Sequence, residues 1–193
     1  MKIAIVCYPT FGGSGVVATE LGLELARRGH EIHFITYSQP VRLALLNNNV
    51  HYHEVNVPEY PLFHYQPYEL ALSSKLVDMV KLYKIELLHV HYAIPHAYAG
   101  YMAKQMLKEE GIDIPMVTTL HGTDITLVGN HPFYKPAVTF SINQSDKHTN
   151  PKLIQRCCGN IDTENACLLS AQKKRIHSGI PIEVRRRAIM RRL

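Results

Sequence analysis

The sequence predicts an α/β protein built on a Rossmann-like parallel sheet with helices on both faces. Short apolar runs alternate with longer amphipathic stretches through about residue 146. The first run, Ile3-Ala4-Ile5-Val6-Cys7, is continuously apolar, as expected of a strand buried on both faces. Two polar loops, Phe11–Gly15 and Thr118–Asp124, each follow a strand-like run. Both loops are therefore expected at the carboxyl edge of one sheet, where α/β proteins bind ligands.

The N-terminal part of the chain contains three expected strands and one helix. Residues 3–7 form the first strand, and apolar residues then recur at helical spacing from Val16 until Arg28-Gly29 ends the helix. The next strand is Glu31–Thr36. Residues 50–57 alternate between apolar and polar side chains and form the third strand.

The following part repeats the alternation with two helices and two strands. A loop rich in Pro and Tyr precedes an amphipathic helix over Tyr68–Tyr83, and Leu87–Val90 is the fourth strand. A second helix is expected over Ile94–Lys108, followed by the fifth strand at Met116–Leu120. Alternating strands and helices with short connections imply right-handed crossovers and a parallel sheet.

The first loop combines three glycines with a serine at Gly12, Gly13, Ser14 and Gly15. Glycines let the backbone approach a ligand closely, and the first N–H groups of the following helix lack intrahelical partners. An anion bound there is also stabilised by the helix dipole. The spacing matches neither a P-loop nor the G-x-G-x-x-G dinucleotide pattern, so a plain turn between strand and helix stays open.

The second loop exposes a histidine directly after a buried strand. Gly122 permits a tight turn that presents His121, and Thr119, Thr123 and Asp124 add hydroxyl and carboxylate groups. Such a polar cluster can recognise a sugar through hydrogen bonds. Capping of the next helix by Thr123 or Asp124 is an alternative role that is compatible with ligand binding.

Histidines on strands raise a different hypothesis, a metal-dependent hydrolase. The pairs His89/His91 and His51/His53 each lie on one face of a strand, as two metal ligands would. Asp124 is the best carboxylate to complete such a set. Histidines on strands are more often hydrogen-bonded structural residues, so the expectation is that no metal is bound.

Composition limits the chain to one core with an appendage. The chain has 193 residues, 46% of them apolar, and no run approaches the about 20 apolar residues that span a bilayer. Its start runs directly into a strand pattern, so we expect a cytoplasmic protein without membrane insertion. The four cysteines lack metal-ligand spacing and are expected to be ordinary thiols.

The positive charge is concentrated after Asp146. Up to that residue there are 10 basic and 13 acidic residues, whereas Lys147–Leu193 holds 11 basic and 3 acidic ones. We therefore expect a domain over residues 1–146 and an irregular, poorly ordered basic tail over 147–193. The tail lacks a nucleic-acid-binding module and interleaved aromatics, so no specific nucleic-acid binding is expected.

Three stretches together resemble a known enzyme family. They are Ile5-Val6-Cys7-Tyr8-Pro9-Thr10-Phe11-Gly12-Gly13-Ser14-Gly15, His89-Val90-His91-Tyr92-Ala93-Ile94-Pro95-His96-Ala97 and Val117-Thr118-Thr119-Leu120-His121-Gly122-Thr123-Asp124. In this order they look like the N-terminal domain of the N-acetyl-α-D-glucosaminyl L-malate synthases. That family consists of retaining family 4 glycosyltransferases with the GT-B fold, which begin bacillithiol biosynthesis. The resemblance covers about residues 1–146.

The resemblance implies substrates and residue roles. Such enzymes transfer N-acetylglucosamine from UDP-GlcNAc to the hydroxyl of L-malate, keep the α configuration and need no cofactor or catalytic metal. His121 would act at the donor sugar near the reacting carbon. The acceptor-binding residues would be Ser14, Tyr92 and Thr119. The donor-binding residues would be Gly12, Gly13, Ser14, Gly15 and Asp124.

Two departures from the family pattern lead to an expectation of incomplete function. Residues 137–141 lack an arginine that pairs with an acceptor carboxylate in some relatives, and the resemblance ends at Ser145-Asp146. The family continues there into a second domain that supplies most of the nucleotide-sugar site. We therefore expect this N-terminal, acceptor-side domain to be inactive alone, and a reading-frame disruption after Asp146 is one hypothesis for the tail. A non-catalytic sugar- or carboxylate-binding module and a homo-oligomer both stay open.

Overall fold

The computed structural model describes residues 1–43 and 48–149, and their strands form one parallel sheet. The strand order is β3-β2-β1-β4-β5-β6, the order of a doubly wound nucleotide-binding fold. The order reverses between β1 and β4, so a crevice for ligands is expected beyond their carboxyl ends. The strands are β1 Lys2–Val6, β2 Glu31–Thr36, β3 Val50–Glu54, β4 Leu87–His91, β5 Met116–Thr119 and β6 Lys147–Thr149.

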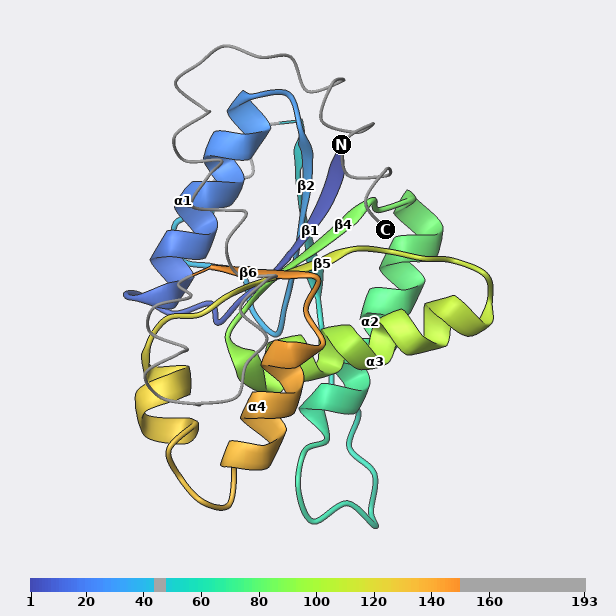
Figure 1. Ribbon diagram of the computed structural model, residues 1–193. Helices are drawn as coiled ribbons and strands as arrows, with labels where there is room; N and C mark the ends of the chain where they lie inside the picture. Colours follow the sequence, from blue (N-terminus) through green and yellow to red (C-terminus); the bar gives the residue numbers. More distant parts are fainter. Residues whose placement is uncertain (44–47, 150–193) are drawn as a thin grey trace.

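Helices cover both faces of the sheet, as the sequence predicted. Figure 1 shows α1 on one side of the sheet and α2 and α3 on the other. The helices are α1 Ser14–Arg27, α2 Tyr68–Tyr83, α3 Tyr98–Glu109 and α4 Lys135–Asn143, with short π-helical turns η1 at Ala93–Ala97 and η2 at Asp124–Val128. Within the described part of the chain, no helix is long and apolar enough to cross a membrane.

Alternate residues of β1 contribute to two of the three hydrophobic clusters in the described part of the chain. Ala4 and Val6 pack with α2 and α3, whereas Ile3 and Ile5 pack on the opposite face with α1. All four side chains are almost fully buried. Burial on both faces explains why this strand is a continuous apolar run instead of an alternating one.

The helix predicted over residues 94–108 is divided in the structure. Ile94 has an extended conformation, with φ −128° and ψ 141°, and interrupts the helical path before α3 begins at Tyr98. The cause is Pro95, because a proline ring disfavours the helical conformation of the residue before it. The resulting η1 turn brings the segment after β4 across the carboxyl edge of the sheet.

The sheet continues three residues beyond the predicted domain boundary at residue 146. Lys147–Thr149 forms β6 and pairs with β5, and Val117 faces Lys147 in the register. Asp146 anchors this edge, because its Oδ2 accepts bonds from the Met116 N–H at 2.6 Å and from Lys104 Nζ at 2.5 Å. The rest of the predicted tail, residues 150–193, lies outside the described residues.

Candidate functional site

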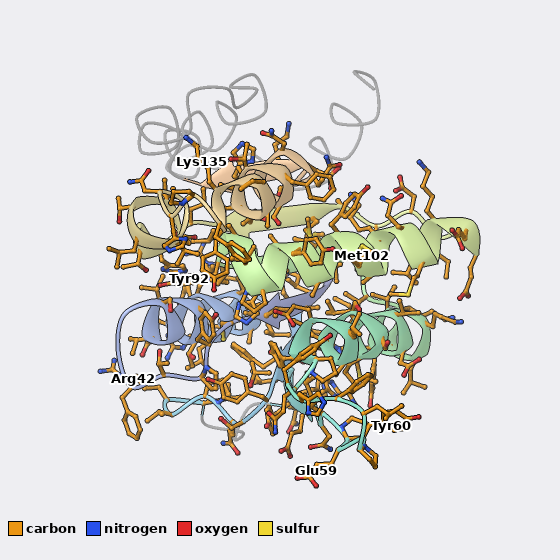
Figure 2. All side chains as sticks on the ribbon, turned by 90° about the horizontal axis from the view of Figure 1, so that it is seen from below. Arg42, Glu59, Tyr60, Tyr92, Met102 and Lys135 are labelled. Carbon is orange, nitrogen blue, oxygen red and sulfur yellow. The ribbon has the colours of Figure 1, made fainter. Side chains whose placement is uncertain are left out.

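The loops after β1, β4 and β5 meet at the carboxyl edge of the sheet. The ring of Tyr8, after β1, contacts the ring of Tyr92 edge to face at 5.1 Å. Tyr92 in turn stacks on His121 with ring centroids 5.4 Å apart and planes 15° apart. Figure 2 places Tyr92 between α1 and the start of α3, away from Tyr60. Ring contacts therefore connect the segments that follow β1, β4 and β5, and both predicted loops lie at this edge of the sheet.

The glycine loop holds the N-terminus of α1 against the end of β1. A Cβ atom on Gly15 would lie 2.5 Å from the carbonyl oxygen of Tyr8 and 2.7 Å from that of Thr10, so only glycine fits. Gly13 adopts φ +57°, which glycine tolerates and other residues rarely do. Gly12 and Gly13 are exposed, with open space where a side chain would stand. The backbone just before α1 is thus open to solvent, next to the helix end whose first N–H groups can bind an anion.

Asp124 joins the loop after β4 to the loop after β5. Its side chain is fully buried, and Oδ1 accepts bonds from the N–H groups of Gly122 at 2.8 Å and His121 at 3.1 Å. Oδ2 accepts a bond from the Ala93 N–H at 3.3 Å. Burial raises the pKa of this carboxyl, and the same N–H bonds oppose the shift. Asp124 therefore positions both loops from beneath, and its predicted contact with the donor stays a prediction.

His121 is hydrogen-bonded to a second, buried histidine. Its Nε2 lies 2.9 Å from Nδ1 of His91, whose side chain is fully buried. Burial lowers the pKa of His91 to about 2 and also lowers the pKa of His121. Both imidazoles are therefore neutral at pH 7, and one must donate a proton to the other.

The surroundings of His91 determine which ring donates. Its Nε2 is buried without a hydrogen-bond partner in the described part of the chain. A buried N–H without a partner is rarer and costlier than a buried lone pair, so the proton belongs on Nδ1. His91 then donates to Nε2 of His121. The remaining nitrogen of His121, Nδ1, carries a proton and can donate to a ligand.

Tyr92 has an unusual backbone for a residue with a side chain. Its φ is 86° and its ψ is 140°, close to a region that is populated almost only by glycine and costs about 1–3 kcal/mol for other residues. Its hydroxyl bonds to the Thr123 hydroxyl, and its N–H donates to the Thr119 carbonyl oxygen at 2.9 Å. The strained backbone thus aims the ring across the mouth of the site.

Four of the predicted site residues contact one another in the structure, whereas Ser14 shares only their edge of the sheet. Tyr92, Thr119, His121 and Asp124 belong to one network of contacts. Ser14, the first residue of α1, lies at the same edge of the sheet, and the substrate contacts predicted for it remain predictions.

Sequence reasoning missed Tyr8 and His96, whose rings lie 4.5 Å apart beside this network. Both positions belong to stretches that carried the family resemblance. Their ring contact joins two residues 88 positions apart, which no local pattern in the sequence indicates.

Of the two histidine pairs behind the metal hypothesis, His89 and His91 are hydrogen-bonded within the protein. His89 and His91 do share a face, with rings stacked at 4.8 Å. Nε2 of His89 bonds to the Thr119 hydroxyl at 2.8 Å, and Nδ1 of His91 bonds to His121. The carboxylate oxygens of Asp124, the best additional ligand, already accept backbone N–H bonds. These contacts give His89 and His91 hydrogen-bonding roles within the sheet.

Comparisons with known sequences agree on one family. The model of Glycosyltransferase Family 4 matches residues 11–151. The N-acetyl-alpha-D-glucosaminyl L-malate synthase of Bacillus anthracis is 54% identical over 146 residues, which are 76% of this chain and 38% of that protein. An uncharacterized glycosyltransferase of Methanocaldococcus jannaschii is 29% identical over 147 residues, or 73% of this chain and 39% of that one. The chain thus spans about two fifths of the length of these relatives.

Solved structures share the fold. A lipopolysaccharide outer core galactosyltransferase, WaaB, superposes with a TM-score of 0.58 at 15% identity, covering 86% of this chain and 44% of that one. The sucrose-phosphate synthase of Thermosynechococcus elongatus superposes with a TM-score of 0.55 at 13% identity, covering 84% and 46%. In both cases this chain matches somewhat less than half of a GT-B glycosyltransferase.

Proposed function

Because the chain belongs to glycosyltransferase family 4, we propose that its described domain is the acceptor-side half of a retaining glycosyltransferase. The proposed reaction transfers N-acetylglucosamine from UDP-GlcNAc to the hydroxyl of L-malate. The 54% identity to a protein named as that synthase supports these substrates. A cytoplasmic location is part of the proposal.

One observation carries the proposal: the N-terminus of α1 and the Tyr92–His121 stack lie at the same switch point of the sheet. The open N–H groups beside Gly12 and Gly13 offer positive potential to the carboxylates of malate or the phosphates of the donor. The hydroxyls of Tyr92 and Thr119, which bond to Thr123 and His89, belong to the same edge of the sheet and suit the polar groups of the acceptor.

His121 acts in this proposal as a neutral hydrogen-bond donor to the transferred sugar. Its Nδ1–H remains free for a ligand when His91 donates to Nε2. Its lowered pKa makes it a weak proton acceptor, and its Nε2 already accepts the His91 proton, so the leaving phosphate takes the proton from the malate hydroxyl. The bond from the anomeric carbon to phosphate oxygen breaks while the bond to malate oxygen forms on the same face. Catalysis then rests on positioning and on stabilisation of the departing charge.

The 193-residue chain alone is proposed to bind substrate without turning it over. Orienting two reactants at near-attack distance is worth about 7–11 kcal/mol, and the described residues form only one wall of a GT-B cleft. Gly12 and Gly13 are open to solvent, so a diphosphate bound there keeps contact with water. In water, the electrostatic stabilisation of developing charge is weak.

An assay with radiolabelled UDP-GlcNAc and malate tests the activity. We expect no labelled N-acetylglucosaminyl-malate from the chain alone, and product when a C-terminal domain of the malate synthase family is fused after Thr149. His121→Ala in the fusion should abolish the product. Product from the 193-residue chain alone would contradict the claim of inactivity, and none from a folded fusion would contradict the proposed reaction.

A non-catalytic sugar- or carboxylate-binding module is the second candidate. The exposed glycine loop at one wall favours it, because such a surface can hold a carboxylate without a second domain. Chemical-shift titration with malate should perturb residues of the two loops and leave His51 and His53 unchanged. Malate binding by a fusion that never yields product would favour the binding module over the transferase.

A further inference from the structure

A second cluster of titratable side chains lies at the opposite edge of the sheet. Glu31 is the first residue of β2, and its Oε1 lies 3.1 Å from Nε2 of His33 and 3.7 Å from Nε2 of His51. The three donor atoms all lie within 4.8 Å of one another. Because the strands are parallel, this amino-terminal edge lies away from the carboxyl edge that holds His121.

The strand register brings these side chains together. His33 and His51 are direct partners in the pairing of β2 with β3, so they point to the same face. Glu31 lies two residues before His33 and shares that face. The rings of His33 and His51 stack with centroids 4.7 Å apart. The arrangement is thus set by backbone pairing and does not depend on the rotamer of one flexible side chain.

We infer that Glu31, His33 and His51 form a zinc-binding site through Oε1 and the two Nε2 atoms. Two imidazole nitrogens and one carboxylate oxygen are a ligand set that zinc accepts, with a fourth position left for water. Glu31 and His51 are partly exposed, with side chains 31% and 39% accessible, so an ion can enter from solvent. His33 is fully buried and forms the floor of the site.

A third histidine holds His33 in the orientation that metal binding needs. Nε2 of His53 lies 2.9 Å from Nδ1 of His33, and the Tyr83 ring packs against both rings at 4.8 Å. When Nε2 of His33 binds a metal, its Nδ1–H must donate to an acceptor, and the neutral His53 ring provides one. Such an orienting partner is typical of histidines that bind zinc.

Lys2 is the cation that now balances Glu31. Its Nζ lies 3.0 Å from Oε2 and 3.2 Å from Oε1, the oxygen that the histidines approach, and its side chain is 39% exposed. The ammonium group of Lys2 must therefore leave Oε1 before that oxygen binds the ion, and the partial exposure of its side chain lets it turn to solvent. A bound ion would connect the edge strand β3 to β2, and binding to the folded state alone raises stability. The site is separate from the proposed transfer reaction, which needs no metal.

Isothermal titration of the tag-free chain with zinc chloride tests the inference. We expect one zinc ion bound by this cluster and a loss of affinity of at least about tenfold in His51→Gln and Glu31→Gln. His53→Gln should weaken binding by about 10–100-fold as the orienting partner. His64→Gln is the matched control, because His64 is an exposed histidine in the loop before α2, and it should leave the affinity unchanged.

Two further measurements separate this site from adventitious binding. Cobalt absorption should show a nitrogen and oxygen environment without thiolate charge transfer, and zinc should raise the unfolding temperature of the wild type more than that of His51→Gln. Equal zinc affinity in wild type, His51→Gln and Glu31→Gln would overturn the inference. Absence of binding at about 0.1 mM free zinc would also overturn it.

Discussion

Nδ1 of the buried His91 lies 2.9 Å from Nε2 of the half-buried His121, so the inner ring sets the proton position on the outer one. Nε2 of His91 has no hydrogen-bond partner among the described residues, so His91 keeps its proton on Nδ1, the nitrogen that faces His121. The outer ring therefore faces a ligand as a neutral N–H donor. This relationship makes His91 a positioning residue for His121.

The first prediction tests that relationship through the tautomer of His121. We expect long-range nitrogen–proton NMR spectra of the wild type to show the proton of His121 on Nδ1. His91→Phe removes the donor and should return His121 mainly to the Nε2–H form, whereas His91→Asn places an amide N–H near the old Nδ1 and should preserve the native tautomer. A wild-type His121 protonated on Nε2 would contradict the argument.

The second prediction concerns the close packing at Gly15. Gly15→Ala pushes a methyl group into the carbonyls of Tyr8 and Thr10, so we expect a loss of about 1–3 kcal/mol in the free energy of unfolding. Gly12→Ala is the control, because its Cβ would enter open space, and it should change stability by less than about 0.5 kcal/mol. Urea denaturation measures both. Equal effects of the two substitutions would show that the loop does not pack as described.

The third prediction concerns the strained backbone of Tyr92. Tyr92→Gly and Tyr92→Ala both remove the ring, but only glycine adopts φ 86° without strain. We therefore expect the glycine variant to be the more stable one, with a free energy of unfolding about 1 kcal/mol above that of the alanine variant. This is the reverse of the usual order. Both should lose the malate-dependent shifts at His121. An alanine variant as stable as the glycine variant would mean that the backbone relaxes.

The fourth prediction concerns acid. Burial lowers the pKa of His91 to about 2 and that of His96 to about 4, although a bond from His96 Nδ1–H to the His91 carbonyl opposes the second shift. The unfolded chain takes up these protons near pH 6.5, and the folded chain does so only far below that value. The free energy of unfolding is therefore highest above about pH 6.5. As the pH drops toward 4, it falls by about 1.4 kcal/mol per pH unit for each of these histidines.

Urea denaturation at pH 8 and pH 5 measures this loss. His96→Asn can keep a donor to the His91 carbonyl and removes one titrating ring. The slope of the unfolding free energy against pH should therefore decrease by the equivalent of about one bound proton. His64→Gln, at an exposed position, serves as the control. Unchanged pH dependence in His96→Asn would mean that His96 is protonated in the folded state.

Local patterns predicted most of the fold correctly. The strand Glu31–Thr36 and the helix Tyr68–Tyr83 match their predicted bounds, because each has a clear period and ends at a turn signal or a change of period. The third strand ends at Glu54 and not at residue 57, since alternation continues in the sequence after its pairing with β2 has ended. Strand ends depend on a partner strand that the local sequence does not reveal.

The candidate site was predicted only in part. Glycines and polar residues after apolar runs indicated Gly12, Thr119 and His121, and the family resemblance added Tyr92 and gave all four residues their roles. The sequence did not reveal that Asp124 lies under the loop, since an exposed ligand and a buried anchor have the same local pattern. It also did not pair Glu31 with His51, which comes from another strand.

Taken alone, the sequence determined the α/β class, the order of the elements and the family, because hydrophobic period and short motifs are local properties of the chain. The tertiary structure decided which side chains touch. His91 meets His121 because β4 lies beside β5, and His33 meets His51 because β2 lies beside β3. Such contacts join residues far apart in the sequence, and their geometry is fixed by strand register and burial.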